Sequence, residues 1–458
     1  MSDKRQKIQL ELAFTEMSRS EAPRHSAEGT EAPVAKREAE SKAASEQLME
    51  QICERKNCTQ ALARVKSNKG SAGIDGMTVA QLPAYLKKHW PTIREQLLSG
   101  SYKPQPVKRV AIPKPDGGMR QLGIPTVLDR FIQQAVMQVL QRSWDQTFSA
   151  HSYGFRPGRS AHQAVAQAQQ YIAEGYGWVV DLDLEKFFDR VNHDKLMAKL
   201  ARRISDKRLL KLIRAFLRAG VLEGGLVSPV DEGTPQGGPL SPLLSNIVLN
   251  ELDRELERRG HRFVRYADDS NIYVRSQRAG ERVMKSISEF ITKKLKLKVN
   301  EQKSAVSRPS KRKFLGFSFT WEREPKRRIA PKAIARFKQR VRELTRRTRG
   351  VKVETMVAQL SRYLRGWRGY FGFCQTPWVL RSLDKWLRRR LRAVVWQQWK
   401  RGRGRFAELR KRGVSNDLAA KAAGSAHGPW RLSKSPALHI ALPKVYFASL
   451  GLTPLVVN

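Results

Sequence analysis

The sequence predicts an α+β chain whose first two thirds mix strands with helices and whose last third is helical and strongly basic. Three observations predict this division. Short β-rich runs alternate with longer helical patterns as far as about residue 320. Beyond about residue 325 the strand patterns stop, and runs rich in Lys and Arg follow. Hydrophobic residues make up 40% of the 458 residues, an ordinary share that permits about three domains with real cores.

The elements can be assigned in order along the chain. Residues 1–45 are polar and rich in Ala, Glu and Ser, which predicts a flexible tail. Alternation or short apolar runs predict strands at 107–125 (a hairpin turning at Asp116-Gly117), 177–183, 261–266, 270–274 and 314–320. Helical patterns begin near Glu46 and cover about 127–142, about 192–218 and most of the chain after 325.

The charge of the chain narrows the class of partner. Lys and Arg number 87 against 42 Asp and Glu, which gives a formal net charge of +45. A chain this basic condenses onto a polyanion, so the charge favours nucleic acid. A general solubility surplus and an anionic membrane surface are the alternatives.

Several other classes are excluded by composition. No run of about 18 apolar residues is present, so no membrane-spanning helix and no membrane partner are expected. The N-terminus lacks the continuous apolar core of a secretory signal. The three cysteines form no C-x-x-C pair, which fits a reducing compartment and disfavours a structural zinc site.

Aspartates stand at the ends of apolar strands. Asp181 and Asp183 end one strand, and Asp268 and Asp269 stand at the tip of the predicted 261–274 hairpin. A single acid is normally a solvated surface group, but several like charges side by side are costly unless a cation is present. Carboxylate oxygens suit Mg²⁺, and two such ions would clamp a phosphoryl displacement. In so basic a chain, these acids predict a metal-dependent polymerase or nuclease.

Longer strings around these acids then become recognisable. Tyr266-Ala267-Asp268-Asp269 resembles the catalytic hairpin of reverse transcriptases, although four letters alone are a weak signal. The ordered blocks are more specific: GSAGIDGMT (70–78), IPKPDGGMRQLGIPT (112–126), SAHSYGFRPGRSAHQAV (149–165), VVDLDLEKFFDRVNH (179–193), EGTPQGGPLSPLLSNIVLNELD (232–253), LKLKVNEQKS (295–304), KFLGFSF (313–319) and LSRYLRGWRGYFGF (360–373). Together they resemble the group II intron reverse transcriptases, or maturases, over nearly the whole chain beyond residue 50.

The resemblance implies a right-hand polymerase, with fingers and a palm built on an antiparallel sheet, followed by a helical thumb or maturase domain and a small basic C-terminal domain. The domains expected after the tail are fingers at 46–175, palm at 176–322 with part of the fingers interleaved, thumb at 323–400, and a DNA-binding region at 401–458. Many members continue into an endonuclease domain. Because this sequence stops at Asn458, we expect the endonuclease-lacking type, without second-strand cleavage and with its primer supplied from elsewhere.

The resemblance also implies the catalytic residues. Asp183, Asp268 and Asp269 match the metal ligands, and the backbone carbonyl of Leu184 would help them to hold two Mg²⁺ ions, with Mn²⁺ as an alternative. Asp181 lies two residues from Asp183 and therefore on the same face of the strand. It is either a metal-adjacent acid or a structural one.

The nucleotide-binding residues follow from the same motifs. Phe188 matches the position under the incoming sugar, where an aromatic ring favours dNTP over NTP; a plain core Phe is the alternative. Lys114 and Arg120 flank the finger turn and match the triphosphate-binding cations, unless they only charge the surface of the hairpin. Gln236 matches a residue that contacts nucleotide or template. Contacts to template, primer or RNA are expected from Arg156, Arg159, Gly237, Lys303, Arg362, Arg365 and Arg368.

The resemblance therefore implies an RNA-directed DNA polymerase that binds its group II intron RNA, assists splicing and copies the intron into DNA during retrohoming. Its expected partners are the intron RNA, an RNA template with DNA primer and dNTPs, and target DNA, in a bacterial cytoplasm near the nucleoid. Two alternatives remain. One is another bacterial reverse transcriptase of retron, diversity-generating or defence type, against which the thumb string argues. The other is a splicing-only maturase, against which the intact acids argue.

Overall fold

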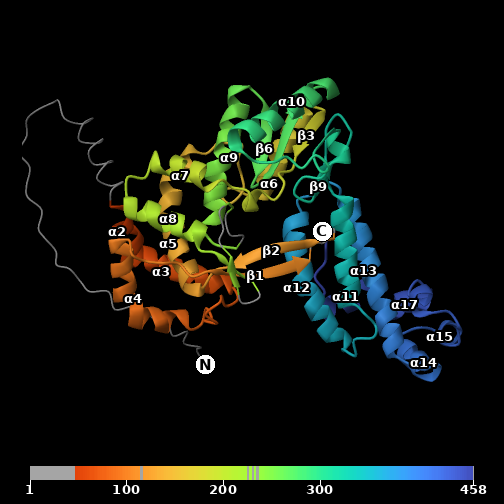
Figure 1. The fold of residues 1–458 in the computed structure, drawn as a ribbon. Coiled ribbons are helices and arrows are strands. Elements are labelled where there is room, and N and C mark those ends of the chain that lie inside the picture. Colours follow the sequence, from red (N-terminus) through yellow and green to blue (C-terminus); the bar gives the residue numbers. More distant parts are fainter. Residues whose placement is uncertain (1–46, 114–116, 224–225, 229–231, 234–236, 457–458) are drawn as a thin grey trace, which may run out of the picture. The chain divides into compact units, whose positions relative to one another are not determined.

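The computed structural model describes residues 47–113, 117–223, 226–228, 232–233 and 237–456, so the predicted flexible tail lies outside it. The chain forms two compact units, each assembled from segments far apart in sequence (Figure 1). The first unit holds the chain up to Ser160 with Asp181–Ile272 and Glu281–Ala305. The second holds Ala161–Val180, Tyr273–Gly280 and the chain from Val306 onward.

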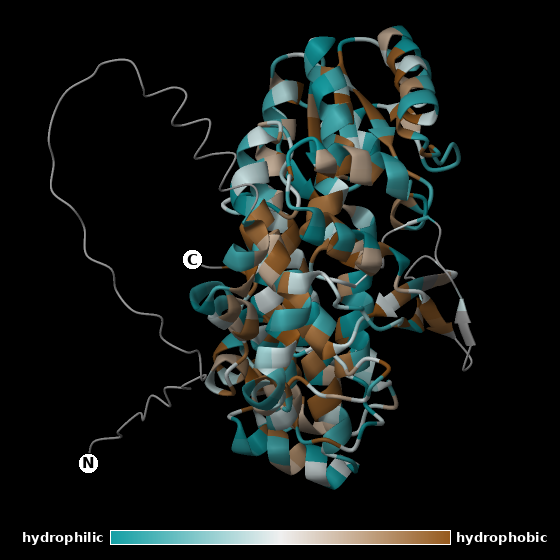
Figure 2. Ribbon diagram, turned by 60° about the vertical axis from the view of Figure 1, so that its left-hand side comes forward, coloured by the Kyte–Doolittle hydropathy of each residue, from teal (hydrophilic) through white to brown (hydrophobic). Residues whose placement is uncertain are grey.

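Helices dominate both units. Those at 48–68 and 127–144 lie where the sequence predicts helices, whereas those at 82–99, 161–173, 241–258 and 277–290 were not predicted. Before residue 300 the helices are α2 (Leu48–Cys53), α3 (Arg55–Asn68), α4 (Leu82–Ser99), α5 (Val127–Trp144), α6 (Ala161–Ala173), α7 (His193–Ala201), α8 (Lys207–Arg218), α9 (Ser241–Arg258) and α10 (Gln277–Phe290). Short 3-10 turns form at Asp145–Thr147, Phe187–Asp189 and Pro309–Lys311, and a π turn forms at Ile291–Leu295. Many helices are banded in brown and teal (Figure 2), as expected for amphipathic helices on a core.

The single helix expected over about 192–218 is wrong, because two helices occupy that range. Asp206 lies between α7 and α8, and its carboxylate accepts hydrogen bonds from the backbone amides of Arg208 and Leu209. An Asp in this position caps the first turn of a new helix. The apolar spacing hid the break because both helices bury one face, with Leu200 and Leu209 fully buried on either side of it.

Three small sheets carry the strands. Their elements are β1 (Val107–Pro113), β2 (Met119–Ile124), β3 (Trp178–Leu182), β4 (Val221–Glu223), β5 (Leu226–Ser228), β6 (Arg262–Tyr266), β7 (Asp269–Val274), β8 (Ala305–Ser307), β9 (Phe317–Phe319) and β10 (Arg327–Ile329). The sheet orders are β2-β1-β4-β5, β10-β9 and β6-β7-β3-β8. β1 with β2, β4 with β5 and β9 with β10 pair antiparallel, whereas β1 with β4 is parallel, so the first sheet is mixed rather than wholly antiparallel.

The predicted finger hairpin is confirmed. β1 and β2 pair antiparallel from Lys108 opposite Ile124 to Pro113 opposite Met119. Gly117 and Gly118, with φ of 92° and 78°, adopt the left-handed backbone that the tight turn requires. The turn residue Asp116 lies outside the described residues.

The segment after residue 313 differs in detail from the expectation. The strand predicted over 314–320 is reduced to β9, because Leu315 and Gly316 have positive φ and turn the chain before it. β9 pairs with β10, a strand within a stretch that the sequence analysis assigned to helices. Its Arg327–Ile329 sequence alternates too briefly to give a strand signal.

The basic C-terminal part of the second unit is helical, as predicted. Its helices are α11 (Pro331–Leu344), α12 (Val353–Phe371), α13 (Pro377–Gln398), α14 (Gly402–Lys411), α15 (Asn416–Ala423), α16 (Pro429–Leu432), α17 (Pro436–Ala441) and α18 (Lys444–Ser449). They share one hydrophobic core, in which Leu360 and Leu364 of α12 meet Leu387 and Trp396 of α13. Among the described residues, no helix is long and apolar enough to cross a membrane.

Candidate active site

The acidic residues singled out in the sequence lie at the ends of neighbouring strands. β3 ends at Leu182, directly before Asp183, and the β6–β7 hairpin turns at Ala267 and Asp268. Because β7 stands next to β3 in the sheet, both acidic ends belong to adjacent strands. Asp183 and Asp268 are half-buried, whereas Asp269 is exposed.

The chain around Asp183 is held by residues 298–304. The Asp183 amide donates to Ser304 Oγ at 3.0 Å, and the Asp183 carbonyl accepts from the amide of Asn300 at 2.8 Å. Next to it, Leu184 pairs with Val299 in an antiparallel bridge. The LKLKVNEQKS block therefore fixes the backbone that carries Asp183, the first of the acids predicted to be catalytic.

Two lysines of the same block neutralise acids beside this backbone. Lys303 Nζ lies 3.5 Å from Asp183 Oδ2, and its side chain is 66% exposed. Lys298 Nζ lies 3.2 Å from Glu185 Oε2. The hydrogen bond from Lys298 lowers the pKa of the Glu185 carboxyl, so this group stays ionised at neutral pH.

Asp181 has a structural contact. In the amide orientation that satisfies both ends of the Asn271 side chain, its nitrogen donates to Asp181 Oδ1 at 3.0 Å. Asn271 is buried in β7, and Asp181 lies in β3. Of the two roles left open by the sequence, this contact favours the structural one, in which Asp181 joins the two strands that carry the acids.

Within the described parts of the chain, no group of three or more His, Cys, Asp and Glu side chains is placed to hold a metal ion. The acids at the strand ends are nevertheless oxygen donors of the kind that Mg²⁺ prefers. Mg²⁺ is usually bound through one or two carboxylates together with water and substrate phosphates, rather than in an all-protein cage. The residues present thus fit a magnesium site that substrate completes.

The β6–β7 hairpin rests on a buried arginine that was not among the predicted site residues. Arg265, the last residue but one of β6, is 0% exposed. Its Nε and Nη2 donate to the two carboxylate oxygens of Asp253 at 2.7 and 2.6 Å. Its Nη1 donates to Asn246 Oδ1 and to the carbonyl of Ala267, both at 2.9 Å. The guanidinium therefore holds the carbonyl that immediately precedes Asp268.

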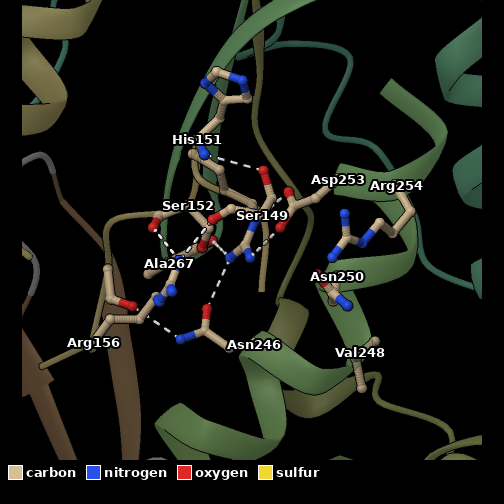
Figure 3. Close-up of polar contacts among 12 residues, drawn as sticks. Ser149, His151, Ser152, Arg156, Asn246, Val248, Asn250, Asp253, Arg254 and Ala267 are labelled. Carbon is tan, nitrogen blue, oxygen red and sulfur yellow. Dashed lines mark hydrogen bonds and ion pairs between the residues drawn. The ribbon is translucent and has the colours of Figure 1, made fainter. Parts of the chain in front are cut away.

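This hydrogen bond supports a strained turn. Ala267 has a φ of 57°, a left-handed conformation that costs an L-residue roughly 1–2 kcal/mol. Asn246 and Asp253 lie seven residues apart, so both project from one face of α9. Figure 3 shows Asn246, Asp253 and Ala267 gathered with the segment from Ser149 to Ser152. The buried polar cluster fixes the direction in which Asp268 leaves the turn.

The finger block around Gly154 packs directly on the same turn. The amide of Arg265 donates to the carbonyl of His151, and the amide of Tyr153 donates to the carbonyl of Arg265, both at 2.9 Å. Asn246 Nδ2 donates to the Gly154 carbonyl at 2.9 Å. A Cβ on Gly154 would lie 2.2 Å from the backbone nitrogen of Ala267, closer than any real contact. Only glycine fits at this position.

We therefore expect Gly154→Ala to displace the hairpin turn and to lower at least tenfold the primer extension that the sequence motifs predict. The added methyl group meets backbone at Ala267, which cannot rotate away as a flexible side chain can. Steady-state primer extension measures the loss. Gly428→Ala is the matched control, because a Cβ there meets nothing within 4 Å. Equal activity of the two variants would contradict the proposed contact.

Phe188, which the sequence motifs predict to lie under the incoming sugar, belongs to the short turn that follows β3. It is half-buried in the 3-10 turn Phe187–Asp189, with its ring 5.2 Å from that of Phe187. Gly233, which was not among the predicted site residues, packs closely against this turn. A Cβ on Gly233 would lie 2.8 Å from the Phe188 carbonyl oxygen. Its positive φ of 95° is a second reason for glycine.

The other predicted nucleotide contacts cannot be placed. Lys114 and Gln236 lie outside the described residues. Arg120 belongs to β2, opposite Ile112, and its side chain is outside the description. These three remain predictions from the sequence.

Arg156 serves the fold itself, unlike the expected nucleic-acid contact. Its Nε donates to Asp145 Oδ1 at 2.8 Å, and its Nη1 donates to the carbonyls of Ser149 and Ser152 at 2.6 and 2.9 Å. The side chain is only 5% exposed. Arg159 is exposed, with its guanidinium 5.3 Å from the Tyr153 ring, and stays available to a phosphate.

The two glycines after Gln236 approach protein. A Cβ on Gly237, which has a φ of 137°, would lie 2.7 Å from the Gly123 carbonyl oxygen of β2. A Cβ on Gly238 would lie 2.3 Å from Gln133 Oε1. The missing side chain of Gly237 makes room for β2, and its expected contact with template or primer stays a prediction.

The arginines of α12 face outward while its apolar residues face the core. Arg362 and Arg365 are exposed. Arg368 is half-buried and donates to the carbonyl of Pro454 at 3.3 Å. Trp367, between them in sequence, is 8% exposed and packs 4.3 Å from the Phe337 ring. The helix thus buries Trp367 and leaves Arg362 and Arg365 exposed, and RNA binding by the arginines stays a prediction.

Three residues that build the hairpin support were missed: Arg265, Asp253 and Gly154. A signal for two of them exists in the sequence. Asp253 and Asn246 are polar residues at seven-residue spacing on the apolar face of α9, and Arg265 interrupts an apolar strand. A buried charge needs a partner, so these positions predict one another.

Comparisons with known proteins agree with the motifs. A family model described as reverse transcriptase (RNA-dependent DNA polymerase) matches residues 112–319, and one described as group II intron, maturase-specific domain matches residues 334–413. Protein YkfC of Escherichia coli (strain K12) is 43% identical over 199 residues, which cover 42% of this chain and 52% of that protein. The group II intron-encoded protein LtrA of Lactococcus lactis subsp. cremoris is 31% identical over 323 residues, 56% of this chain and 54% of that protein.

The chain spans about half the length of these curated relatives. Among solved structures, a chain of a partial Cas6-RT-Cas1–Cas2 complex is 27% identical, with a TM-score of 0.35. That alignment covers 54% of this chain and 42% of the other.

Proposed function

We propose, since this chain belongs to the family of group II intron reverse transcriptases and maturases, that it is an RNA-directed DNA polymerase that also binds a group II intron RNA and assists its splicing. The observation that carries the polymerase activity is the placement of Asp183 and Asp268 at the ends of adjacent strands, β3 and β7. The substrates are an RNA template, a DNA primer and dNTPs.

Asp183, Asp268 and Asp269, with the backbone carbonyl of Leu184, are the residues proposed to hold Mg²⁺, or Mn²⁺ in its place. When bound, two ions would neutralise charge on the reacting phosphates and align the primer end with the nucleotide. The chain contributes the geometry: residues 298–304 fix the Asp183 backbone, and Arg265 fixes the turn before Asp268.

Cations beside the acids bind the polymer. Lys303 is 66% exposed and lies at Asp183, so its ammonium can move from the carboxylate to a primer phosphate when cations occupy the acids. Phe188 is proposed to lie under the incoming sugar, where its ring leaves no room for a 2′-hydroxyl. Lys114, Arg120 and Gln236 are proposed to bind the triphosphate or the template.

The second part of the function is RNA binding by the helical region. Splicing itself is chemistry of the RNA, and the protein would supply folding and positioning of that RNA. We assign this role to residues 323–400, and target-DNA binding to the basic segment 401–458. A chain with a net charge of +45 that acts on intron RNA and target DNA would act in the bacterial cytoplasm, near the nucleoid.

Primer extension tests the polymerase proposal. The purified chain is incubated with poly(rA)/oligo(dT), dTTP and Mg²⁺, and extended products are resolved by size. We expect long products with Mg²⁺ and none after chelation by EDTA. A folded chain that binds intron RNA and promotes splicing, but never extends the primer, would identify the splicing-only alternative instead.

We expect the arginines of α12 to set the salt dependence of RNA binding. Changing Arg362, Arg365 and Arg368 together to Gln removes three cations, and each phosphate contact contributes about 0.7 to 0.9 to the slope of log K against log salt concentration. The slope should therefore become shallower by about 2 to 3. Binding to intron RNA is measured by filter retention between 50 and 300 mM KCl, at roughly evenly spaced salt concentrations.

The control is a triple variant with the same charge loss at a different place. Arg254 and Arg258 of α9, and Arg259 directly after it, form ion pairs with Glu257 and Glu255, so two of the three positive charges are already balanced. Their change to Gln should leave the slope nearly unaltered. If both triple variants lose the same slope, net charge alone governs binding and the α12 surface has no special role.

A further inference from the structure

Two tryptophans of the second unit are left in solvent. Trp321 is 88% exposed and Trp378 is 65% exposed, although Trp is one of the most buried residue types on average. Trp378 is the second residue of α13, and the residues after it, Val379 and Leu380, face the core at 5% and 6% exposure. The helix therefore buries its apolar face without using the indole of Trp378.

Two hollows end at the Trp378 side chain. One hollow, of about 440 Å³, is lined by Trp321, Trp378 and Arg328 among others. The other, of about 460 Å³, is lined by Trp378 and Arg328 together with residues of α11. Both volumes lie within the range of about 300–1,000 Å³ that small-molecule sites occupy. Arg328 and Trp378 are shared by the two linings, so the ring of Trp378 borders both hollows.

The charge around the second hollow is of one sign. Its lining contains Arg328 from β10 with Lys338 and Arg342 from α11, and it contains no acid. The remaining lining is apolar and includes Ile334. The exposed indole of Trp378 and the apolar lining provide a surface on which a planar base can stack. The three cations provide positive charge for the phosphates of the nucleotide.

We propose that Trp378 stacks on an unpaired nucleotide of RNA, which enters the 460 Å³ hollow with its phosphates against Arg328, Lys338 and Arg342. This inference rests on the proposed RNA-binding function and adds a specific site to it. RNA, rather than single-stranded DNA, is the occupant because α11 from Ile334 onward and the whole of α13 fall within the region that matches the maturase-specific domain.

A third tryptophan provides the internal contrast. Trp430 is 39% exposed, but the guanidinium of Arg389 already lies 3.8 Å from its ring centroid. Its face is therefore occupied by the protein's own cation. Trp378 is the residue to change and Trp430 is its matched control.

Photocrosslinking and binding test the site on the full chain. Single-stranded RNA and DNA oligonucleotides that carry 5-iodouracil are irradiated with the protein, and the crosslinked peptide is identified by mass spectrometry. We expect RNA to crosslink at Trp378. Trp378→Ala should lose this crosslink and bind a looped RNA hairpin roughly tenfold more weakly, since a base–aromatic stack contributes this much. Trp378→Phe should retain most of the affinity, and Trp430→Ala should bind like the wild type.

The outcomes separate the site from the function that it serves. If Trp378→Ala, shown by circular dichroism to be folded, binds and crosslinks like the wild type, the stacking site is wrong, whether or not the wild-type chain extends primers. Preferential crosslinking of DNA would also overturn the proposal of an RNA site. Failure of the wild-type chain to extend poly(rA)/oligo(dT) would count against the polymerase only, because the crosslink at Trp378 does not depend on it.

Discussion

Asp268→Asn is expected to abolish primer extension, with a loss of at least about 10³-fold, while RNA affinity stays within about twofold. The substitution keeps the size of the side chain and removes the negative charge at the tip of the β6–β7 hairpin. A neutral amide is a much poorer ligand for Mg²⁺ than a carboxylate, so the charge of the reacting phosphates would no longer be balanced. Splicing of the bound intron should continue, because that reaction belongs to the RNA.

The experiment needs two measurements on the same preparation. Primer extension on poly(rA)/oligo(dT) reports the polymerase, and splicing of a precursor RNA at low Mg²⁺ concentration reports the maturase. Glu95→Gln, an exposed acid of α4, is the control for loss of one negative charge. Loss of splicing together with extension, in a folded variant that still binds RNA, would show that the two functions share Asp268.

Arg265→Met is the second variant with a large expected effect, because it leaves Asp253 as an unpaired charge in the core. Both side chains are 0% exposed, and breaking such a pair costs about 3–5 kcal/mol of the free energy of unfolding. Denaturant unfolding followed by circular dichroism measures this loss. Arg258→Met, which removes an exposed arginine from its pair with Glu255, should change the free energy of unfolding far less.

A double variant separates stability from catalysis. Arg265→Met combined with Asp253→Leu removes both charges, so a large part of the stability should return. Primer extension should stay low, because nothing then donates to the Ala267 carbonyl and the strained turn loses its support. If extension returns along with stability, the arginine stabilises the fold but does not position Asp268.

The elements that the sequence predicted have local signals, whereas the short strands β4, β5 and β8 and the helices α4, α6, α9 and α10 were not predicted. Alternation around Asp116-Gly117 and around Ala267-Asp268 marks two hairpins, and both form. The outward arginines and inward Trp367 of α12 follow from helical spacing alone. The break at Asp206 and the strand β10 were missed, because a cap and a three-residue pairing leave little trace in an apolar pattern.

The supports of the candidate site were harder to predict because they connect distant segments. Gly154 needs to be glycine only because Ala267 lies against it, more than a hundred residues later. Arginine is a residue type that commonly binds phosphate, yet the guanidinium of Arg156 donates its hydrogen bonds to Asp145 and to backbone carbonyls. Gly237 has no room for a side chain because the carbonyl oxygen of Gly123 in β2 lies against it.

By itself the sequence determined the chemistry: a strongly basic chain with strand-end aspartates in an ordered set of motifs, since residue types, their charge and their order are fixed before folding. Only the tertiary structure decided how the turn before Asp268 is held, that Asp181 contacts Asn271, and which cations remain exposed. The physical reason is that the energetic effect of a buried charge or of a missing Cβ depends on the group that lies against it. Those groups come together only when the chain folds.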